Sequence, residues 1–400
     1  MNPLSPEVAL ERLIAGIRTR PTTEIIPLEQ SQGRVLAEDL CARCDLPPDD
    51  VSMMDGYAVR ITDLDDRPLP VSQRIPAGRS AQPLALQSVA RLFTGACLPL
   101  GADAVVMQED SELEGSEVRF THRPQPGQHI RRRGEDACIG DIVRRTGSRV
   151  RPQDMGLLAS VGIESVMVYR RLSITVFFTG DELVQPGHSL APGQIYNSNR
   201  FVLRGLLEAL HCNVVDLGVV PDNLDQTLST LTMAASAADI ILTCGGVSVG
   251  EEDHVRTAVE QIGQIDLWRV AIKPGKPFAS GQVNGVPFLG LPGNPVSAFV
   301  VFCLFVRPFI LSSQGVQNWK PLTYQIRANF EWPLAKGRTE WLRAQLHNDE
   351  EGTFLTLMAN QGSASLTSLA QADGLVEIPM GRQVDRGDTV RFMPFSGLLT

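Results

Sequence analysis

Hydrophobic positions near the N-terminus recur at the spacing of one helix face. They are Leu10, Leu13, Ile14 and Ile17, and Ser5-Pro6 before them is a typical helix start. The pattern then becomes extended up to Pro47-Pro48. Beyond this point, short apolar runs such as AVVMQED and SEVRF alternate with Pro and Gly turns as far as about residue 139. The pattern predicts an amphipathic helix, an extended segment and a small, mostly β domain.

The hydrophobic pattern changes after a short helical stretch near residues 152–161. Between about 171 and 318, strand-like segments alternate with amphipathic helices. We expect strands at 172–178, 214–219, 240–243, 267–272 and 287–291, and helices at 199–211, 224–237, 254–262 and from about Val296. This alternation predicts a doubly wound, largely parallel sheet. From about residue 319 the pattern returns to short strands and turns, which is typical of a small β-barrel or sandwich.

Length and composition limit the class of protein. At 400 residues the chain is too long for one core, so two to four domains are expected. Apolar residues make up 43% and charged residues 20%, as in an ordinary soluble chain. The longest unbroken apolar run, 298–306, is far shorter than the ~20 residues of a membrane-spanning helix. The N-terminus lacks the apolar block of a secretory signal, so we expect a cytoplasmic protein without a membrane partner.

Seven cysteines occur without a framework of pairs. An odd number, with Cys212, Cys244 and Cys303 in apolar surroundings, suits a reducing cytosol. Cys41 and Cys44 form a CxxC, but a zinc site would need a second pair of ligands, and none stands out in the sequence. We therefore interpret the cysteines as ordinary thiols.

The net charge of −9 argues against a nucleic-acid partner. The one basic cluster, Arg131-Arg132-Arg133, runs directly into Gly134-Glu135-Asp136. Three arginines are too few to track a nucleic acid but enough to bind one small anion. A solvated loop with surface ion pairs explains the cluster equally well.

Polar and glycine-rich segments follow the predicted strands of the alternating region. They are TGDE (179–182), Pro221-Asp222, GGVSVGEED (245–253), KPGKP (273–277) and GLPGNPVS (290–297). Ligands of an open parallel sheet bind at the carboxyl ends of its strands. We therefore expect these five loops to gather on one edge of the sheet.

Several groups on these loops suit an oxyanion. Glycines let backbone N–H groups approach it, the first turn of a helix has free N–H groups, and lysines add positive charge. The candidates are Gly245, Gly246, Ser248, Lys273, Lys276, the N-cap candidate Asn294, and Pro295 at the start of the last helix.

Three acids, Glu182, Asp222 and Asp253, lie on the same loops and would repel that anion unless a divalent cation lay between them. Mg²⁺ characteristically uses one or two carboxylates together with substrate phosphates, so the pattern predicts a magnesium-bridged, phosphate-bearing substrate. Simpler explanations remain for each part: Asp253 as a helix cap, the glycines as common turns, and Lys276 as a solvated charge. The GxGxxG and P-loop fingerprints are absent from the sequence.

These loop motifs resemble the molybdopterin-binding domain of the molybdopterin molybdenumtransferase family. The resemblance lies in TGDEL (179–183), GGVSVGEED (245–253), KPGKP (273–277) and GLPGNPVSA (290–298). MDGYAVR (54–60), FTGACLPLGADAVVMQED (93–110), IRRRGED (130–136) and QGSAS (361–365) extend it over nearly the whole chain in family order. A molybdopterin adenylyltransferase would share only the middle domain, which favours the molybdenumtransferase.

The resemblance implies a multidomain α/β plus β fold with four parts. A linking domain would comprise residues 1–45 and 140–170, a small mostly-β domain residues 46–139, a molybdopterin-binding α/β domain residues 171–318, and a C-terminal β-barrel residues 319–400. It also implies a homodimer whose active cleft lies between the α/β domain of one subunit and the small β domain of the other. The substrates would be adenylylated molybdopterin and molybdate, with Mg²⁺ as cofactor and AMP released. Molybdopterin adenylyltransferase and molybdoenzyme maturation proteins are further partners that the resemblance implies.

Site residues are carried over position by position. The catalytic set falls on Asp55, Thr94, Asp136, Glu182, Asp222 and Asp253, and the last three would hold Mg²⁺. The molybdate pocket falls on Lys273, Pro274, Ser297, Arg343 and Ser363, and further substrate contacts on Gly245, Gly246, Ser248, Lys276, Pro292, Asn294 and Pro295. Lysine, arginine and hydroxyl donors suit a tetrahedral dianion. The dithiolene sulfurs can attack the metal, so the protein would contribute positioning and electrostatics.

The sequence departs from the usual family pattern at a few positions. Relatives commonly have Phe at the position of Asp49 and Ala at that of Met53, and some have Lys at that of Arg269. The last change keeps the charge but alters the hydrogen-bonding shape. Two other functions are a scaffold, since the same fold serves in gephyrin as a receptor-clustering module, and a sugar-phosphate or nucleotide-binding protein. The presence of all the expected acidic and basic positions favours the enzyme.

Overall fold

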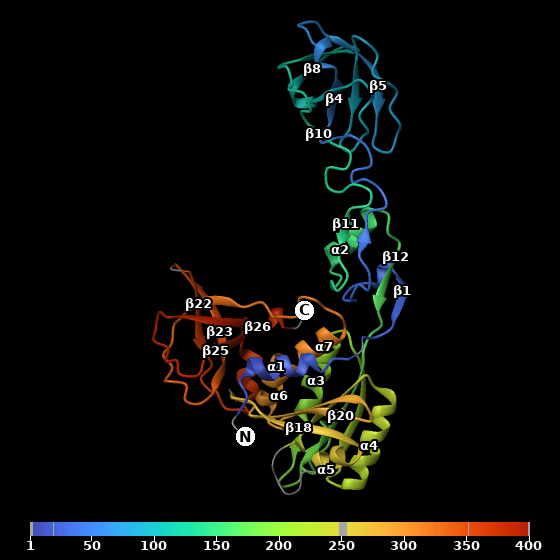
Figure 1. Cartoon of the computed structure of the whole chain (residues 1–400). Coiled ribbons are helices and arrows are strands. Elements are labelled where there is room, and N and C mark those ends of the chain that lie inside the picture. The colour runs from blue at the N-terminus through green and yellow to red at the C-terminus, as the bar shows by residue number, and fades with distance from the viewer. Residues whose placement is uncertain (1–2, 19, 248–253, 351, 399–400) are drawn as a thin grey trace.

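The computed structural model describes residues 3–18, 20–247, 254–350 and 352–398 and arranges them in four parts (Figure 1). A small β domain lies at one end of an elongated molecule and is joined by a narrow linking domain to an α/β domain at the other end. A C-terminal β-barrel lies beside the α/β domain. The multidomain architecture expected from the sequence is confirmed.

The small β domain is built on a six-stranded sheet in the order β7-β4-β6-β5-β9-β8. The strands of this sheet are β4 (Gly56–Val59), β5 (Leu69–Ile75), β6 (Val89–Leu92), β7 (Ala104–Met107), β8 (Ser111–Glu114) and β9 (Glu117–Phe120). β3 (Val51–Ser52) and β10 (Ile130–Arg131) form a separate two-stranded ribbon. Side chains alternate between two buried clusters, with Ala58 in one and Tyr57 in the other. Both faces of the sheet are therefore covered.

The linking domain consists of two short antiparallel ribbons and one helix. β1 (Thr23–Pro27) pairs with β12 (Ser165–Tyr169), and β2 (Leu40–Cys41) pairs with β11 (Ile142–Arg144). The helix α2 (Pro152–Ser160) packs against them, with Leu158 fully buried. Segments from two distant parts of the chain thus form one small core.

The α/β domain contains a six-stranded sheet in the order β16-β13-β17-β21-β20-β18. Its strands are β13 (Ser173–Thr179), β16 (Asn213–Val220), β17 (Ile240–Cys244), β18 (Gly263–Arg269), β20 (Pro277–Val283) and β21 (Val286–Leu291), with a side ribbon of β14 (Leu183–Val184) and β15 (Ile195–Tyr196). The helices α3 (Ser198–Ala209), α4 (Leu224–Ala237) and α5 (His254–Ile262) connect them. Four neighbouring strands are parallel, as the sequence predicts.

The other two strands form an antiparallel edge that the sequence pattern did not reveal. β20 runs against both β21 and β18. Its sequence, PFASGQV, begins with Pro and contains Ser and Gly, so its strand propensity is weak. Because β18 and β21 both run opposite to β20, they point the same way. The segment after β18, which contains KPGKP, therefore still emerges at the carboxyl edge.

The N-terminal helix α1 (Pro6–Ala15) begins where the sequence predicts, with the Ser5 side chain accepting a hydrogen bond from the Val8 N–H (3.3 Å). We expected residues 1–45 to belong to the linking domain. Instead, Ala9 and Leu13 are buried in the core of the α/β domain, and α1 lies beside α6 and α7 (Figure 1).

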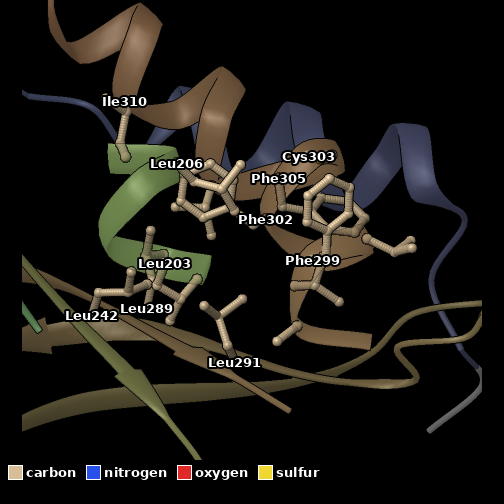
Figure 2. Close-up of a cluster of buried hydrophobic side chains, with 14 of the residues drawn as sticks. Leu203, Leu206, Leu242, Leu289, Leu291, Phe299, Phe302, Cys303, Phe305 and Ile310 are labelled. Carbon is tan, nitrogen blue, oxygen red and sulfur yellow. The ribbon is translucent and has the colours of Figure 1, made fainter. Parts of the chain in front are cut away.

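The core of the α/β domain surrounds one long apolar helical run, α6 (Pro295–Val301), a π-helical turn (Phe302–Val306) and α7 (Arg307–Ser313). Phe299, Phe302 and Phe305 belong to one buried cluster with Leu203 and Leu206 of α3 (Figure 2). Burying each such side chain contributes about 1.5–3 kcal/mol. Within the described chain, this run alone has the length and composition of a membrane span, but 94% of it is buried inside the protein, as expected for a core helix.

The C-terminal part is a closed five-stranded barrel, in which β23 pairs with both β24 and β25. Its elements are β22 (Tyr324–Ala328), β23 (Thr339–Asp349), β24 (Gly352–Leu357), α8 (Leu366–Gln371), β25 (Gly374–Ile378) and β26 (Thr389–Pro394). A short strand from the α/β domain, β19 (Ile272–Lys273), pairs with the start of β23. This pairing attaches KPGKP to the barrel.

Candidate active site

A cavity of about 820 Å³, called here the sheet cavity, lies at the carboxyl edge of the parallel strands. The ends of β13, β17 and β21 and the starts of α3 and α6 surround it. It brings together eight of the predicted site residues: Glu182, Asp222, Gly245, Gly246, Pro292, Asn294, Pro295 and Ser297. Ser248 and Asp253 lie outside the described residues.

One wall of the sheet cavity is acidic. Burial raises the pKa of Asp222, and the charges of Asp181 and Glu182 raise it further. The Asp222 backbone N–H donates to Asp181 Oδ1 at 3.3 Å, which holds the two loops together. Gly180 has a φ of +136°, a backbone conformation that L side chains rarely adopt, which favours glycine there.

Carboxylates that repel one another fit a divalent cation. The described residues contain no group of three or more His, Cys, Asp or Glu side chains that could by itself hold a metal. Glu182 and Asp222 would therefore supply two ligands, and phosphate oxygens and water the others, which is the ligand set that Mg²⁺ prefers.

The turn after β17 requires its two glycines. Gly245 and Gly246 have φ values of +99° and +64°. A Cβ atom on Gly246 would lie 2.5 Å from Val255 Cγ2 of α5, and one on Gly245 would lie 2.8 Å from the carbonyl oxygen of Thr179. The turn thus packs directly between β13 and α5, and its backbone forms the floor of the cavity.

Two asparagines of the sheet cavity were missed by the sequence analysis. Asn197 caps α3 by accepting a hydrogen bond from the Arg200 N–H (3.2 Å), and its buried Nδ2 has no partner in the described structure. Asn199 Nδ2 donates to the Gly293 carbonyl (2.7 Å), and its buried Oδ1 is likewise without a partner there. The signal was the Asn-Ser-Asn sequence at the start of the predicted helix, which is a typical N-cap.

Cys244, at the end of β17, also lines the sheet cavity. Its thiol donates to the Pro292 carbonyl oxygen (3.2 Å) and accepts from Asn199 Nδ2 (3.1 Å). Burial raises the pKa of Cys244 to about 12. The group is therefore a neutral thiol at physiological pH.

A second pocket of about 310 Å³, called here the barrel pocket, lies between KPGKP, the start of α6 and the barrel. It contains five predicted residues: Lys273, Pro274, Lys276, Ser297 and Ser363. Among the lining residues that were not predicted are Trp332, Arg338, Glu340 and Trp341. Three cations, Lys273, Lys276 and Arg338, face one acid, Glu340, so the pocket has an excess of two positive charges. Ser297 lines both the barrel pocket and the sheet cavity, so the two sites share a wall.

Arg343 is fully buried and does not line either site. Its guanidinium donates to the carbonyl oxygens of Asn360 (2.8 Å) and Gly362 (3.0 Å) and to Ser368 Oγ (3.2 Å). Burial lowers its pKa to about 10. The Ser363 carbonyl in turn accepts from the Val296 N–H of α6 (2.9 Å), so one helical N–H expected to bind an anion is already used. Arg343 therefore braces the loop that carries Ser363.

Asp55, Thr94 and Asp136 lie in or beside the small β domain, far from both pockets of the same subunit (Figure 1). Asp55 Oδ1 accepts from the backbone N–H (2.7 Å) and the hydroxyl (2.8 Å) of Thr94. These two bonds hold the pKa of Asp55 below its usual value. A single subunit thus brings Asp55 and Thr94 together but does not bring them to the sheet cavity.

The basic cluster forms ion pairs at the junction with the linking domain. Arg131 pairs with Asp136, Arg132 with Asp50 (2.6 Å) and Arg133 with Asp45 (2.6 Å). All three arginines are therefore neutralised by nearby carboxylates. Of the two interpretations left open by the sequence, the structure favours the ion-paired loop.

The carboxyl edge of the open sheet has paired acids, and a cationic pocket lies next to it. This arrangement is typical of an α/β protein that binds phosphates and small oxyanions. Three family matches specify the class further. Residues 4–162 match the MoeA N-terminal region (domain I and II), residues 175–312 a probable molybdopterin binding domain, and residues 325–395 the MoeA C-terminal region (domain IV).

Relatives cover the chain from end to end. It is 40% identical over 402 residues to a molybdopterin molybdenumtransferase of Haemophilus influenzae, covering 99% of this chain and 100% of the relative. It is 38% identical to molybdopterin molybdenumtransferase 2 of Mycobacterium tuberculosis, covering 90% and 91%. A crystal structure of the molybdopterin biosynthesis moeA protein from Pyrococcus horikoshii superimposes with a TM-score of 0.83 at 30% identity, covering 98% of this chain and all of that one. The chain belongs to the molybdopterin molybdenumtransferase family, which confirms the resemblance seen in its motifs.

Proposed function

We propose that this protein inserts molybdenum from molybdate into adenylylated molybdopterin and releases AMP. The observation that carries the proposal is the shared wall at Ser297, which separates a carboxylate-lined cavity from a cationic pocket. A substrate that carries both a phosphoanhydride and a pair of sulfurs needs two such sites next to each other. The full-length family match supports the same reaction.

The sheet cavity suits the phosphate-bearing part of the substrate. The Gly245 N–H of its glycine turn already donates to the Leu291 carbonyl (3.1 Å), so the Gly246 N–H is the one that can bind a ligand. Asn294 makes no side-chain capping bond and stays available to a ligand. Glu182 and Asp222 would hold Mg²⁺, which supplies positive charge where the phosphoanhydride is cleaved by water.

The barrel pocket suits molybdate. Lys273, Lys276 and the hydroxyls of Ser297 and Ser363 are donors for a tetrahedral dianion. Insertion forms two metal–sulfur bonds and breaks one metal–oxygen bond. The two thiol protons leave with that oxygen as water, and the metal keeps its oxidation state. The reaction therefore needs positioning and charge, and no protein nucleophile.

We further propose that the working unit is a homodimer acting in the cytosol. The small β domain, whose strands β4, β6 and β10 adjoin Asp55, Thr94 and Asp136, lies at the opposite end of the molecule from the α/β domain (Figure 1). A second subunit is the simplest source of these groups. The partners would be enzymes that supply the adenylylated substrate and proteins that receive the cofactor.

The deciding experiment combines the purified protein with adenylylated molybdopterin, Mg²⁺ and molybdate. We expect AMP release that depends on molybdate. A scaffold protein would release none, and a nucleotide-binding protein would bind the substrate without a dependence on molybdate. Either result would refute the enzyme function.

A further inference from the structure

The barrel pocket contains a carboxylate in a place that suits an anion. The side chain of Glu340 is 10% exposed and lines the pocket together with the three cations. Its Oε2 accepts a hydrogen bond from Trp332 Nε1 at 3.0 Å. A buried negative charge next to an anionic ligand weakens binding of that ligand. Such a cost is useful if it falls more heavily on a competing anion than on the correct one.

Glu340 holds Lys273 only loosely. The Lys273 ammonium lies 3.3 Å from each carboxylate oxygen, which is longer than the roughly 2.7–2.9 Å of a strong charge-assisted bond. The Lys273 side chain is 51% exposed and can turn to a ligand without breaking a tight contact. The pairing of β19 with β23 places Lys273 directly beside Glu340, so the pocket contains both charged residues next to each other.

Other donors of the pocket are unused. The side chains of Lys276 and Arg338 make no hydrogen bond or ion pair to any residue that the structure describes. The buried Nε1 of Trp341, which also lines the pocket, has no partner within the same part of the chain. These donors suit the ionised oxygens of a ligand.

The Glu340 carboxylate, in contrast to these donors, is a hydrogen-bond acceptor. It accepts bonds from Lys273 and Trp332, and a carboxylate has about four acceptor positions, so capacity remains for a further donor. A ligand oxygen that faces Glu340 is attracted if it carries a hydrogen and repelled if it does not.

We propose that Glu340 makes the barrel pocket selective for a tetrahedral oxyanion that presents a hydroxyl, and so excludes sulfate. The proposal rests on the proposed function, because it assigns molybdate to this pocket. Molybdate is a stronger base than sulfate, so the oxygen that faces Glu340 takes up a proton from the buffer at a lower cost in free energy than a sulfate oxygen does. Sulfate, of the same shape and charge, holds no proton at neutral pH and presents only bare oxygens to Glu340.

Phosphate tests whether the pocket prefers an oxyanion that carries a hydroxyl. At neutral pH, hydrogen phosphate has nearly the size of sulfate and the same charge of two, but it carries a hydroxyl. Phosphate and sulfate are titrated separately as competitors of molybdate bound to the full chain, so that only the molybdate pocket is measured. We expect phosphate to compete at least about tenfold better than sulfate, since a site built to bond a hydroxyl rejects a ligand that lacks it.

Glu340→Gln tests the residue directly. The amide keeps the size of the side chain and can still accept from Trp332, but it adds a donor and removes the charge. We expect sulfate to bind at least about tenfold more tightly than to the unmodified protein, which removes the preference for phosphate. Glu340→Asp keeps the carboxylate and should keep the preference. The matched control is Glu377→Gln on β25, whose side chain is 13% exposed and pairs with Arg391 (3.0 Å) away from the pocket; it should leave all three affinities unchanged.

Two results overturn the proposal: equal competition by phosphate and sulfate in the unmodified protein, or an unchanged sulfate affinity in folded Glu340→Gln. The first comparison needs no variant, so it stands even if Glu340→Gln fails to fold. The titrations use no molybdopterin. Loss of molybdate-dependent AMP release with the anion preference intact would therefore overturn the proposed function and leave this anion selectivity standing.

Discussion

Replacing Arg343 with methionine tests whether this residue binds molybdate itself or holds the loop of Ser363 in place for binding. The guanidinium is buried against the carbonyl oxygens of Asn360 and Gly362, whereas the next loop residue, Ser363, lines the barrel pocket. Methionine fills much of the same volume but cannot donate. The substitution therefore leaves two backbone acceptors without their partner while keeping the packing.

The expected loss of stability follows from these contacts. Each hydrogen bond to a charged donor is worth roughly 1.5–3 kcal/mol, so two give about 3–6 kcal/mol. Removing the buried charge also removes its desolvation cost, which offsets part of this loss of stability. We expect Arg343→Met to lower the free energy of unfolding of the barrel by about 2–4 kcal/mol. Molybdate affinity should fall as well, because the Ser363 loop loses its brace.

Urea unfolding followed by tryptophan fluorescence measures the first effect, because Trp332 and Trp341 lie in the barrel. Hydrogen exchange at residues 360–363 reports on the loop, and calorimetry with molybdate on the pocket. The control is Ser363→Ala: its hydroxyl has no hydrogen bond to the residues that the structure describes, so it should weaken molybdate binding and leave the urea midpoint unchanged. If Arg343→Met abolished molybdate binding with an unchanged midpoint and unchanged exchange, a bracing role would be refuted.

Three further outcomes test the α/β domain and the dimer. Gly246→Ala should destabilise the protein by about 1–3 kcal/mol, because the new Cβ meets Val255 at a positive φ; an unchanged melting temperature would contradict this packing. Asp222→Asn should abolish Mg²⁺-dependent AMP release yet slightly raise the melting temperature at neutral pH. The pKa of Asp222 is raised in the folded state, so its charged form opposes folding once the pH exceeds its unfolded value, and the amide removes that cost; a lower melting temperature would refute the sign. Mixed subunits of Asp55→Ala and Asp222→Asn should regain about a quarter of the activity, because half of the dimers are mixed and each has one intact cleft; no recovery after confirmed subunit exchange would exclude a shared cleft.

Local sequence patterns predicted the elements of the α/β domain closely. The helices at 224–237 and 254–262 occur as α4 and α5 with the same bounds. Their apolar positions repeat at helical spacing, and Asn223 caps the start of α4, so short-range physics determines them. The paired acids and the glycine turn were also found, because the carboxyl ends of parallel strands must meet on one edge.

Long-range pairing was not visible in the sequence. Lys273 and Glu340 are 67 residues apart and meet only because β19 leaves the sheet to pair with the barrel. For the same reason Trp332 and Arg338 were not predicted as pocket residues. Arg343 was carried over as a molybdate contact, and only its hydrogen bonds show that it acts on the loop of Ser363. Contacts between domains depend on geometry that no local pattern encodes.

Cys244 shows how the protein avoids competing for the metal that it handles. Molybdenum has a high affinity for ionised sulfur, and this cysteine lies in the wall of the cavity that would hold the sulfur-bearing substrate. Because burial raises its pKa to about 12, and its proton is engaged by the Pro292 carbonyl, the side chain offers no thiolate. This wall of the cavity would therefore not compete with the sulfurs of the substrate for molybdenum.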